Sequence, residues 1–255
     1  FPVQTTAQTP AGPLLLVGPG RVASQVAPAL NLASLTPDGI VIETVGENLL
    51  LAGDRPRGTL YAVYTFLEDA VGCRWWSSKV STIPRLPDLT VPEQHVRYVP
   101  PLEYRETFWA DAFDGDWAAR NKSNGNSERL EDKHGGKVRY GGPFFVHTFA
   151  MLVPPATYFK EHPEYFSEVN GRRLDGYAQV CVTNEAVKKL ITAKVLAYLR
   201  EDPHAQIISV SQNDCDNHCL CATCKKLEDE EGSPAGPLLH LVNYVAAEVG
   251  KQYPQ

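Results

Sequence analysis

The chain has 255 residues, of which 43% are hydrophobic and 21% charged, and its net charge is −6. This length and composition are typical of a globular protein with one large domain or two unequal domains. The negative charge and the lack of any Lys/Arg-rich run argue against a nucleic-acid partner. No apolar stretch reaches the roughly 18 residues that a membrane span requires, so we expect no membrane-spanning segment.

Residues 1–80 have the pattern of a small N-terminal α/β sandwich domain. Three short apolar stretches bounded by turn residues predict strands at 14–17, 40–45 and 48–53. Apolar residues between 60 and 71 recur at helical spacing and predict an amphipathic helix. Residues 81–101 are rich in proline and show no helical period, so we interpret them as a linker.

Residues 102–255 alternate between strand and helix patterns. The predicted strands lie at 102–109, 143–150, 177–184 and 205–214. Polar residues gather where these strands end, which is typical of a parallel TIM (β/α)8 barrel. A full barrel takes about 250 residues and only about four strand–helix units are present. We therefore predict the first half of a TIM barrel, incomplete at the C-terminus, and expect the natural chain to continue past Gln255.

The stretch "LLLVGPGRVA" at 14–23 matches the G-x-G-x-x-A dinucleotide fingerprint, and Glu43 follows at about the expected distance. Pro19 removes one of the backbone N–H groups that would contact a pyrophosphate. The elements predicted after this turn are two successive strands and a helix, whereas a dinucleotide-binding fold continues as alternating strands and helices. We therefore favour a tight turn over an NAD-type site and a nucleotide-dependent oxidoreductase.

Two residues of the first predicted barrel strand are candidates for binding a sugar. Arg105 and Trp109 share one face of the strand, because strand residues alternate between faces. A guanidinium donates a fork of hydrogen bonds, and an indole offers an apolar stacking surface. The alternative is an Arg–Glu pair that closes the bottom of the barrel.

Further candidates follow the later strands. Asn213 and Asp214 emerge at the end of the predicted strand 205–214, where barrel glycosidases place the acid that protonates the leaving oxygen. An Asx turn is the alternative. His147 ends another predicted strand and is either a binding residue at the barrel mouth or a hydrogen-bonded structural histidine.

A cysteine cluster lies directly after Asp214. It has cysteines at 215, 219, 221 and 224. This spacing is tight enough to surround one Zn²⁺, and His218 is a spare ligand. Cys181, at the end of a neighbouring predicted strand, would supply a further thiolate or a disulfide partner. A structural zinc and disulfides both remain open, and a catalytic zinc is less favoured because thiolate-rich sites are usually structural.

Several motifs resemble known families. The segment "GDRPRGTLYAVYTFLEDAVGCRWW" is similar to the α/β domain that precedes the barrel in α-glucuronidases and β-hexosaminidases. Three further segments, "HTFAMLVPPATYFKEHPEYFSEVNGRR", "QVCVTNEAV" and "ISVSQNDCDNHCLCATCKKLEDEEGSPAGPLLHLVNYVA", resemble the DUF4838 family. That resemblance implies a bacterial, exported protein that acts beside polysaccharide-degrading enzymes, with a glycoside-hydrolase-like barrel.

The resemblance also bears on individual residues. It implies that Cys181 joins Cys219, Cys221 and Cys224, whereas Cys215 is additional. By analogy with hexosaminidases, it further implies that Arg105 holds sugar hydroxyls and that Asp214 lies near the scissile bond.

We therefore expect hydrolysis of a glycosidic bond in a complex glycan, with no cofactor beyond a possible structural zinc. Asp214 would be the general acid, and Arg105, Trp109, His147 and Asn213 would bind the carbohydrate. The second carboxylate is expected beyond residue 255. The alternatives are a non-catalytic carbohydrate-binding barrel and a zinc-scaffolded interaction module.

Overall fold

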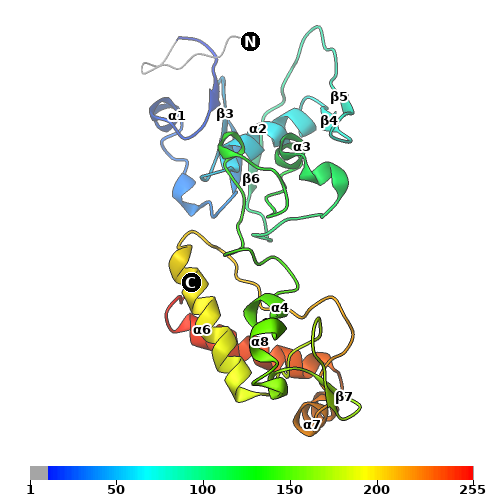
Figure 1. Ribbon diagram of the computed structural model, residues 1–255. Coiled ribbons are helices and arrows are strands. Elements are labelled where there is room, and N and C mark those ends of the chain that lie inside the picture. The colour runs from blue at the N-terminus through cyan, green and yellow to red at the C-terminus, as the bar shows by residue number, and fades with distance from the viewer. Residues whose placement is uncertain (1–10, 255) are drawn as a thin grey trace. The chain divides into compact units, whose positions relative to one another are not determined.

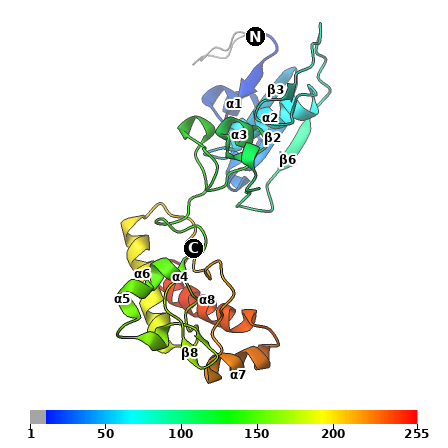
Figure 2. The same cartoon turned by 45° about the vertical axis from the view of Figure 1, so that its right-hand side comes forward.

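The computed structural model describes residues 11–254. The chain forms two compact units (Figures 1 and 2): unit 1 ends at Val138 and unit 2 begins at Arg139. Each unit has its own buried apolar core. Residues 1–10 of the predicted N-terminal domain lie outside the described residues.

Unit 1 is built on a four-stranded mixed sheet in the order β1-β3-β2-β6. Its strands are β1 (Leu15–Val17), β2 (Ile40–Val45), β3 (Asn48–Gly53) and β6 (His95–Tyr98). β1 is parallel to β3, and β2 is antiparallel to both β3 and β6. A short antiparallel pair consists of β4 (Arg74–Trp75) and β5 (Ser81–Thr82). The helices are α1 (Arg21–Val26), α2 (Gly58–Asp69) and α3 (Gly115–Arg120), with 3₁₀ turns at Leu32–Ser34, Ala110–Phe113 and Asp132–His134.

Helix α2 covers one face of this sheet. Its buried Tyr61 and Phe66 pack against Ile40, Ile42 and Leu51 of the strands. The start of α2 packs directly against the end of β3. A Cβ atom on Gly53 would lie only 2.2 Å from the carbonyl carbon of Gly58, so this close approach requires glycine at position 53. The sequence predictions of β2, β3 and α2 are confirmed.

The interpretation of residues 81–101 as a linker differs from the structure. His95–Tyr98 form the edge strand β6, which pairs with β2 in the register Ile40↔Tyr98. The following residues also belong to unit 1, because Arg105 and Asn124 both bind the buried Asp38. The compact units therefore divide between Val138 and Arg139, not within residues 81–101.

The turn at 18–20 is a tight turn. Gly18 adopts φ = 90° and its N–H donates to Leu51 O at 2.8 Å. The sheet contains one parallel pair followed by antiparallel strands, whereas a dinucleotide fold needs successive parallel strands. Glu43 lies 2.8 Å from His95 and pairs with its imidazole.

Unit 2 is mainly helical. Its elements are α4 (Phe149–Leu152), α5 (Pro155–Tyr158), a 3₁₀ turn (Pro163–Tyr165), β7 (Glu168–Val169), β8 (Arg172–Arg173), α6 (Glu185–Glu201), α7 (Ala222–Glu231) and α8 (Ala235–Gly250). Val187, Ile191 and Val195 of α6 are fully buried at spacings of four residues and form the core together with Leu241 and Val245 of α8. Asn184 caps α6, as its sequence position predicts, by accepting hydrogen bonds from two backbone N–H groups.

The described residues form a mixed α/β structure without a closed barrel. None of the four predicted barrel strands forms a regular strand. Phe149 and Ala150 already belong to α4, and the segments 177–184 and 205–214 make only the isolated bridges Phe166↔Val180 (antiparallel) and Tyr140↔Ile207 (parallel). Some of their backbone groups bind the backbone of a neighbouring segment, as Thr148 N–H does with Ser211 O, but others bind side chains, so no regular ladder forms. The N–H of Ser211, for example, donates to Thr148 Oγ1, and that of Asn213 donates to Gln179 Oε1. The half-barrel prediction is therefore not confirmed.

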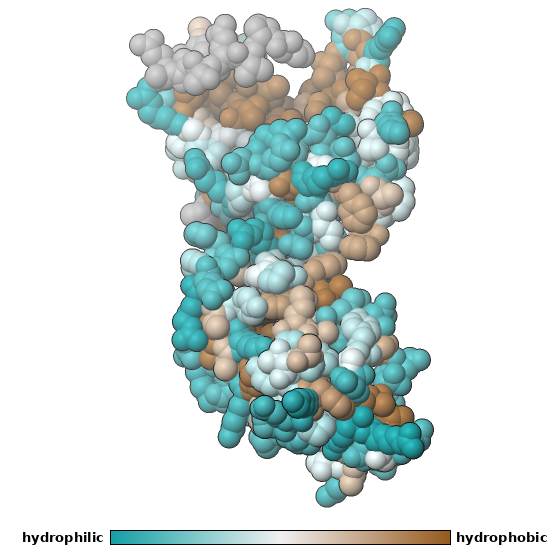
Figure 3. Space-filling view, in the orientation of Figure 1, coloured by the Kyte–Doolittle hydropathy of each residue, from teal (hydrophilic) through white to brown (hydrophobic). Residues whose placement is uncertain are grey.

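The surface of unit 1 carries exposed apolar side chains. Trp76, Val80 and Ile83 are each more than half exposed. Figure 3 shows apolar residues gathered on the part of unit 1 that carries the β4–β5 pair. No helix among residues 11–254 combines the length and apolar character needed to cross a bilayer.

Candidate metal centre

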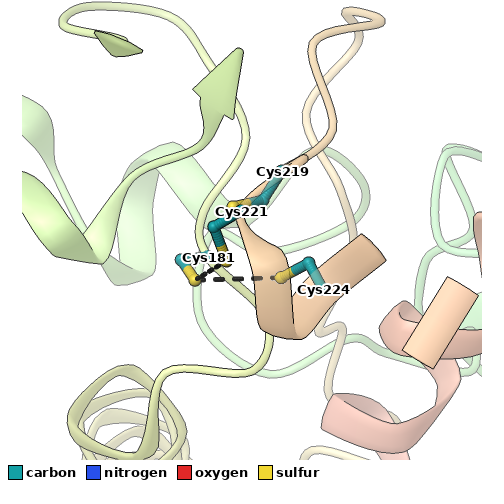
Figure 4. A group of neighbouring side chains, drawn as sticks. All are labelled: Cys181, Cys219, Cys221 and Cys224. Carbon is teal, nitrogen blue, oxygen red and sulfur yellow. Dashed lines mark hydrogen bonds between the residues drawn. The ribbon is translucent and has the colours of Figure 1, made fainter. Parts of the chain in front are cut away.

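Four buried cysteines of unit 2 point toward one another (Figure 4): Cys181, Cys219, Cys221 and Cys224. Their Sγ atoms all lie within 4.8 Å of one another. The Sγ of Cys181 is 3.7 Å from that of Cys221 and 3.8 Å from that of Cys224. A disulfide joins two sulfurs at about 2.05 Å, so these pairs are not bonded. The cluster brings together four soft ligand atoms, which is the donor set of a tetrahedral thiolate metal site.

Two local structures position the ligands. Cys221 is the N-cap residue of α7 and Cys224 lies in its first turn, which places their sulfurs at the same helix end. The segment before α7 runs against β7, because Leu220 N–H donates to Glu168 O at 2.7 Å and Glu168 N–H donates to Cys219 Sγ at 3.4 Å. Cys181 comes from the extended segment that leads into α6, so the cluster joins parts of the chain 38 residues or more apart in sequence (219 − 181).

The β7–β8 hairpin that supports Cys219 follows from its sequence. Asn170 and Gly171 both have positive φ values, 52° and 72°, as a two-residue type I′ turn requires. Arg173, which follows the turn, places Nη1 3.8 Å from Cys219 Sγ. The hairpin therefore brings a fixed positive charge to the cysteine cluster.

Electrostatics favour a cation among the four sulfurs. Hydrogen bonds from Cys219 and Cys224 hold the pKa of Cys181 well below its ordinary value, and the pairing with Cys181 raises the pKa of Cys219 to about 11. The pKa of Cys224 is also raised, chiefly by Cys181. Removal of all four protons needs a compensating positive charge, and a divalent metal ion supplies it.

The other predicted ligands lie outside the cluster. Cys215 is half-buried and its Sγ accepts a hydrogen bond from Gln179 at 3.4 Å. Burial, followed by the charges of Asp216 and Asp214, raises the pKa of Cys215, so its thiol keeps its proton. His218 pairs with Glu228 at 3.2 Å instead of turning toward the sulfurs.

Comparison with known protein families identifies the family of this chain. The sequence model of DUF4838, a domain of unknown function, matches residues 75–255, which include all four clustered cysteines. The chain belongs to the DUF4838 family. No curated protein and no solved structure matched the chain. The description of DUF4838 names no activity, so function has to be argued from the residues.

The predicted catalytic residue of this DUF4838 protein, Asp214, is exposed. Its backbone N–H donates to the hydroxyl of Tyr177 at 2.9 Å, while its carboxylate has no hydrogen bond or ion pair among the described residues. His147 is also exposed, has φ = 57°, and places Nδ1 3.3 Å from Gln212 O. Segments 147–150 and 211–214 therefore run side by side in unit 2 and carry both residues.

Asn213 is only 2% exposed and acts as a structural clamp. Its side chain accepts from Ala150 N–H at 2.9 Å and donates to Ala178 O at 2.7 Å. Its backbone N–H and C=O both bind the Gln179 amide. These hydrogen bonds fix the position of Asn213 and so of the backbone that leads into Asp214. The buried Asn213 amide binds backbone groups of the protein instead of sugar hydroxyls.

Arg105 and Trp109 belong to unit 1, unlike His147, Asn213 and Asp214. The Arg105 guanidinium donates to Asp38 at 2.6 Å, to Lys122 O at 2.9 Å and to Leu102 O at 2.7 Å. Most of its donors are therefore committed to the protein. Trp109 is 49% exposed and packs edge-on against Trp117, with ring centroids 5.3 Å apart.

The hollow beside the cysteine cluster is small. It has a volume of about 30 Å³ and is lined by Gln179, Gln212 and Cys219 among others, but not by Asp214. A cavity of this size holds one or two water molecules. It is too small for a sugar ring.

Sequence reasoning missed three residues that support this site: Glu168, Arg173 and Thr183. Thr183 Oγ1 lies 3.1 Å from Cys224 Sγ and shares a hydrogen bond with it. The Asn-Gly pair is the feature of the sequence that predicts a hairpin here, because Asn-Gly favours a two-residue turn between antiparallel strands. The two strands of this hairpin carry Glu168 and Arg173.

Proposed function

We propose that Cys181, Cys219, Cys221 and Cys224 bind one Zn²⁺ ion. The observation that carries this proposal is the spacing of the sulfurs. Four sulfurs bound tetrahedrally at about 2.3 Å from zinc lie about 3.8 Å apart. The Cys181–Cys221 and Cys181–Cys224 separations of 3.7 and 3.8 Å match this value. Two disulfides would instead need two pairs at bonding distance.

The surroundings of the cluster also suit zinc. A Zn²⁺ ion with four thiolates carries a net charge of −2, and buried charge of this kind needs compensation. Arg173 beside Cys219 supplies a positive charge, and the N–H of Glu168 donates to the same sulfur. Such outer contacts hold ligands in the binding orientation.

The role of this zinc is structural. Four cysteine ligands fill a tetrahedral coordination shell, so no position is left for a water molecule or a substrate. The ion would tie the β7–β8 hairpin, the segment before α6 and the start of α7 to one point. It would thereby fix the loop that presents Asp214.

The test is metal analysis of the purified chain. We expect about one equivalent of zinc by inductively coupled plasma mass spectrometry, released when the thiols are blocked by a mercurial reagent. In a separate sample without the mercurial, alkylation under denaturing conditions with a chelator and without reductant should modify all six cysteines. Metal-free protein with four cysteines protected from alkylation would show disulfides and refute the zinc site.

As a second function, we propose that the exposed face around Asp214 cleaves a glycosidic bond. A carboxylate without a protein partner, a neighbouring tyrosine hydroxyl and a histidine with a strained backbone are the groups that support it. Asp214 would protonate the leaving oxygen. An exported location, where glycans are met, is part of this proposal.

The half-barrel is also part of this second proposal. Its support is the parallel bridge Tyr140↔Ile207, together with the contacts of Thr148 and Gln179 to the segment 211–213. These contacts bring Thr148 and Gln179 beside the segment 207–213, and neighbouring strands of a barrel would also lie side by side.

Hydrolysis is tested with the Asp214→Asn variant. We expect release of reducing sugar from a panel of bacterial and plant polysaccharides to fall at least about 100-fold, because a general acid contributes about 10²–10⁴ to a rate. Asp216→Asn is the matched control, since Asp216 is exposed two residues away. Equal activity of both variants would contradict the role of Asp214, and glycan binding without turnover would indicate a binding protein.

A further inference from the structure

Unit 1 contains a hollow of about 390 Å³, here called the Tyr98 hollow. It is lined by residues of β2, β6 and α2 and by the segments that follow β6 and α3. Small-molecule sites in proteins typically have volumes of about 300–1,000 Å³. The Tyr98 hollow is therefore large enough for a small ligand, unlike the hollow beside the cysteines.

One side of the Tyr98 hollow is apolar and aromatic. Val96 and Tyr98 lie on the same face of β6, because strand residues alternate, and Tyr98 pairs with Ile40 of β2. A second ring, that of Tyr61, lines the hollow from α2, on the same helix face as Thr65 and Asp69. Tyr98 is 52% exposed although its neighbour Ile40 is buried, so its ring is a free apolar surface at the end of the sheet.

The other side is polar. Thr65 and Asp69 of α2 face the hollow together with Asn121, which ends α3. The charged lining residues are two acids, Asp38 and Asp69, and two bases, Arg105 and Lys122. Asp38 pairs with Arg57 and Lys122 pairs with Glu68, and the charges of these two partners also sum to zero. The lining has no net charge, which favours a neutral ligand over an ionic one.

Two other lining residues, Asp38 and Arg105, are held in a buried network of hydrogen bonds. Asp38 is 1% exposed and binds Arg57 at 2.7 Å, Arg105 at 2.6 Å and Asn124 at 3.0 Å. The hydroxyl of Tyr61 donates to Ser123 O at 3.1 Å and fixes the Tyr61 ring in the α2 side of the hollow. A wall that is ordered before binding loses little conformational entropy when a ligand enters.

We infer that the Tyr98 hollow binds a neutral pyranose ring. A pyranose has an apolar C–H face and a rim of hydroxyls, and the hollow offers an aromatic side and a side of short polar groups. The C–H face lies on the Tyr98 ring, and the hydroxyls bind the Asp69 carboxylate and the Asn121 amide. The site is independent of zinc and of Asp214, because all of its residues belong to unit 1.

The test is saturation-transfer NMR on the whole chain with methyl β-glucopyranoside, methyl β-galactopyranoside and methyl β-glucuronide. We expect transfer from the protein to the C–H protons of at least one neutral glycoside, and weaker binding of the anionic glucuronide. Tyr98→Ala should raise the dissociation constant about threefold to tenfold. Asp69→Asn, at the exposed end of α2, should raise it several-fold without affecting the fold.

Val99→Ala is the matched control, because Val99 follows Tyr98 directly but does not line the hollow. Far-UV circular dichroism verifies that each variant is folded. The inference is overturned if neither neutral glycoside shows transfer, if the glucuronide binds more tightly than both, or if Tyr98→Ala and Asp69→Asn bind as the control does. Loss of polysaccharide cleavage in Asp214→Asn with unchanged glycoside binding would separate this site from the proposed hydrolysis.

Discussion

Replacement of Cys224 by serine is expected to abolish zinc binding and to lower the melting temperature of unit 2 by at least about 10 °C. Cys224 is 1% exposed and lies within 4.8 Å of the other three sulfurs, so no other residue of the cluster can take its place. Structural zinc contributes about 10–16 kcal/mol to folding in isolated zinc-finger peptides. Unit 2 has an apolar core of its own, so we expect a smaller loss of about 3 kcal/mol or more, which corresponds to this temperature shift.

Cys215→Ser is the control for this substitution. Cys215 lies nine residues before Cys224 but outside the cluster, so its variant should keep about one equivalent of zinc and an unchanged melting curve. Calorimetry with and without a strong chelator measures both effects, and chelation of the natural chain should reproduce the Cys224→Ser result. A Cys224→Ser variant that retains zinc with the original stability would refute the four-cysteine site.

The parts of the fold that the sequence predicted are those set by local patterns. β2 and β3 each contain three consecutive branched apolar residues, and α2 has a clear helical period. β6 was missed because it is a four-residue edge strand in a proline-rich stretch, and only its pairing with β2 makes it a strand. The β-branched run at 205–214 was predicted as a barrel strand, but its backbone binds the side chains of Thr148 and Gln179.

The same distinction holds for the candidate sites. The spacing of Cys219, Cys221 and Cys224 indicated a metal ligand set, whereas the position of Cys181 beside them follows only from the fold. Strand alternation predicted that Arg105 and Trp109 share one face of a barrel strand, but residues 102–109 form no strand in the structure. Strand alternation also could not show that the guanidinium binds Asp38, which is 67 residues away in the sequence.

The charge of the buried Asp38 is also important for the stability of unit 1. Its carboxylate accepts hydrogen bonds from Arg57, Arg105 and Asn124, and it thereby joins the start of α2 to the segments that follow β6 and α3. Arg57 is itself 4% exposed, so water cannot replace the lost partner. A buried cation that loses its counter-charge destabilises the folded state far more than an exposed ion pair does.

We therefore expect Asp38→Asn to reduce the free energy of unfolding of unit 1 by about 3–5 kcal/mol. Asparagine keeps the size of the side chain and tolerates the positive φ of 67° at this position, so the change isolates the charge. All four tryptophans precede residue 139, so tryptophan fluorescence during urea unfolding reports on unit 1 alone. The control Asp88→Asn, at an exposed position, should change the free energy by less than about 0.5 kcal/mol. A loss below about 1 kcal/mol in Asp38→Asn would mean that the two arginines find other partners, and that the wall of the Tyr98 hollow does not depend on this carboxylate.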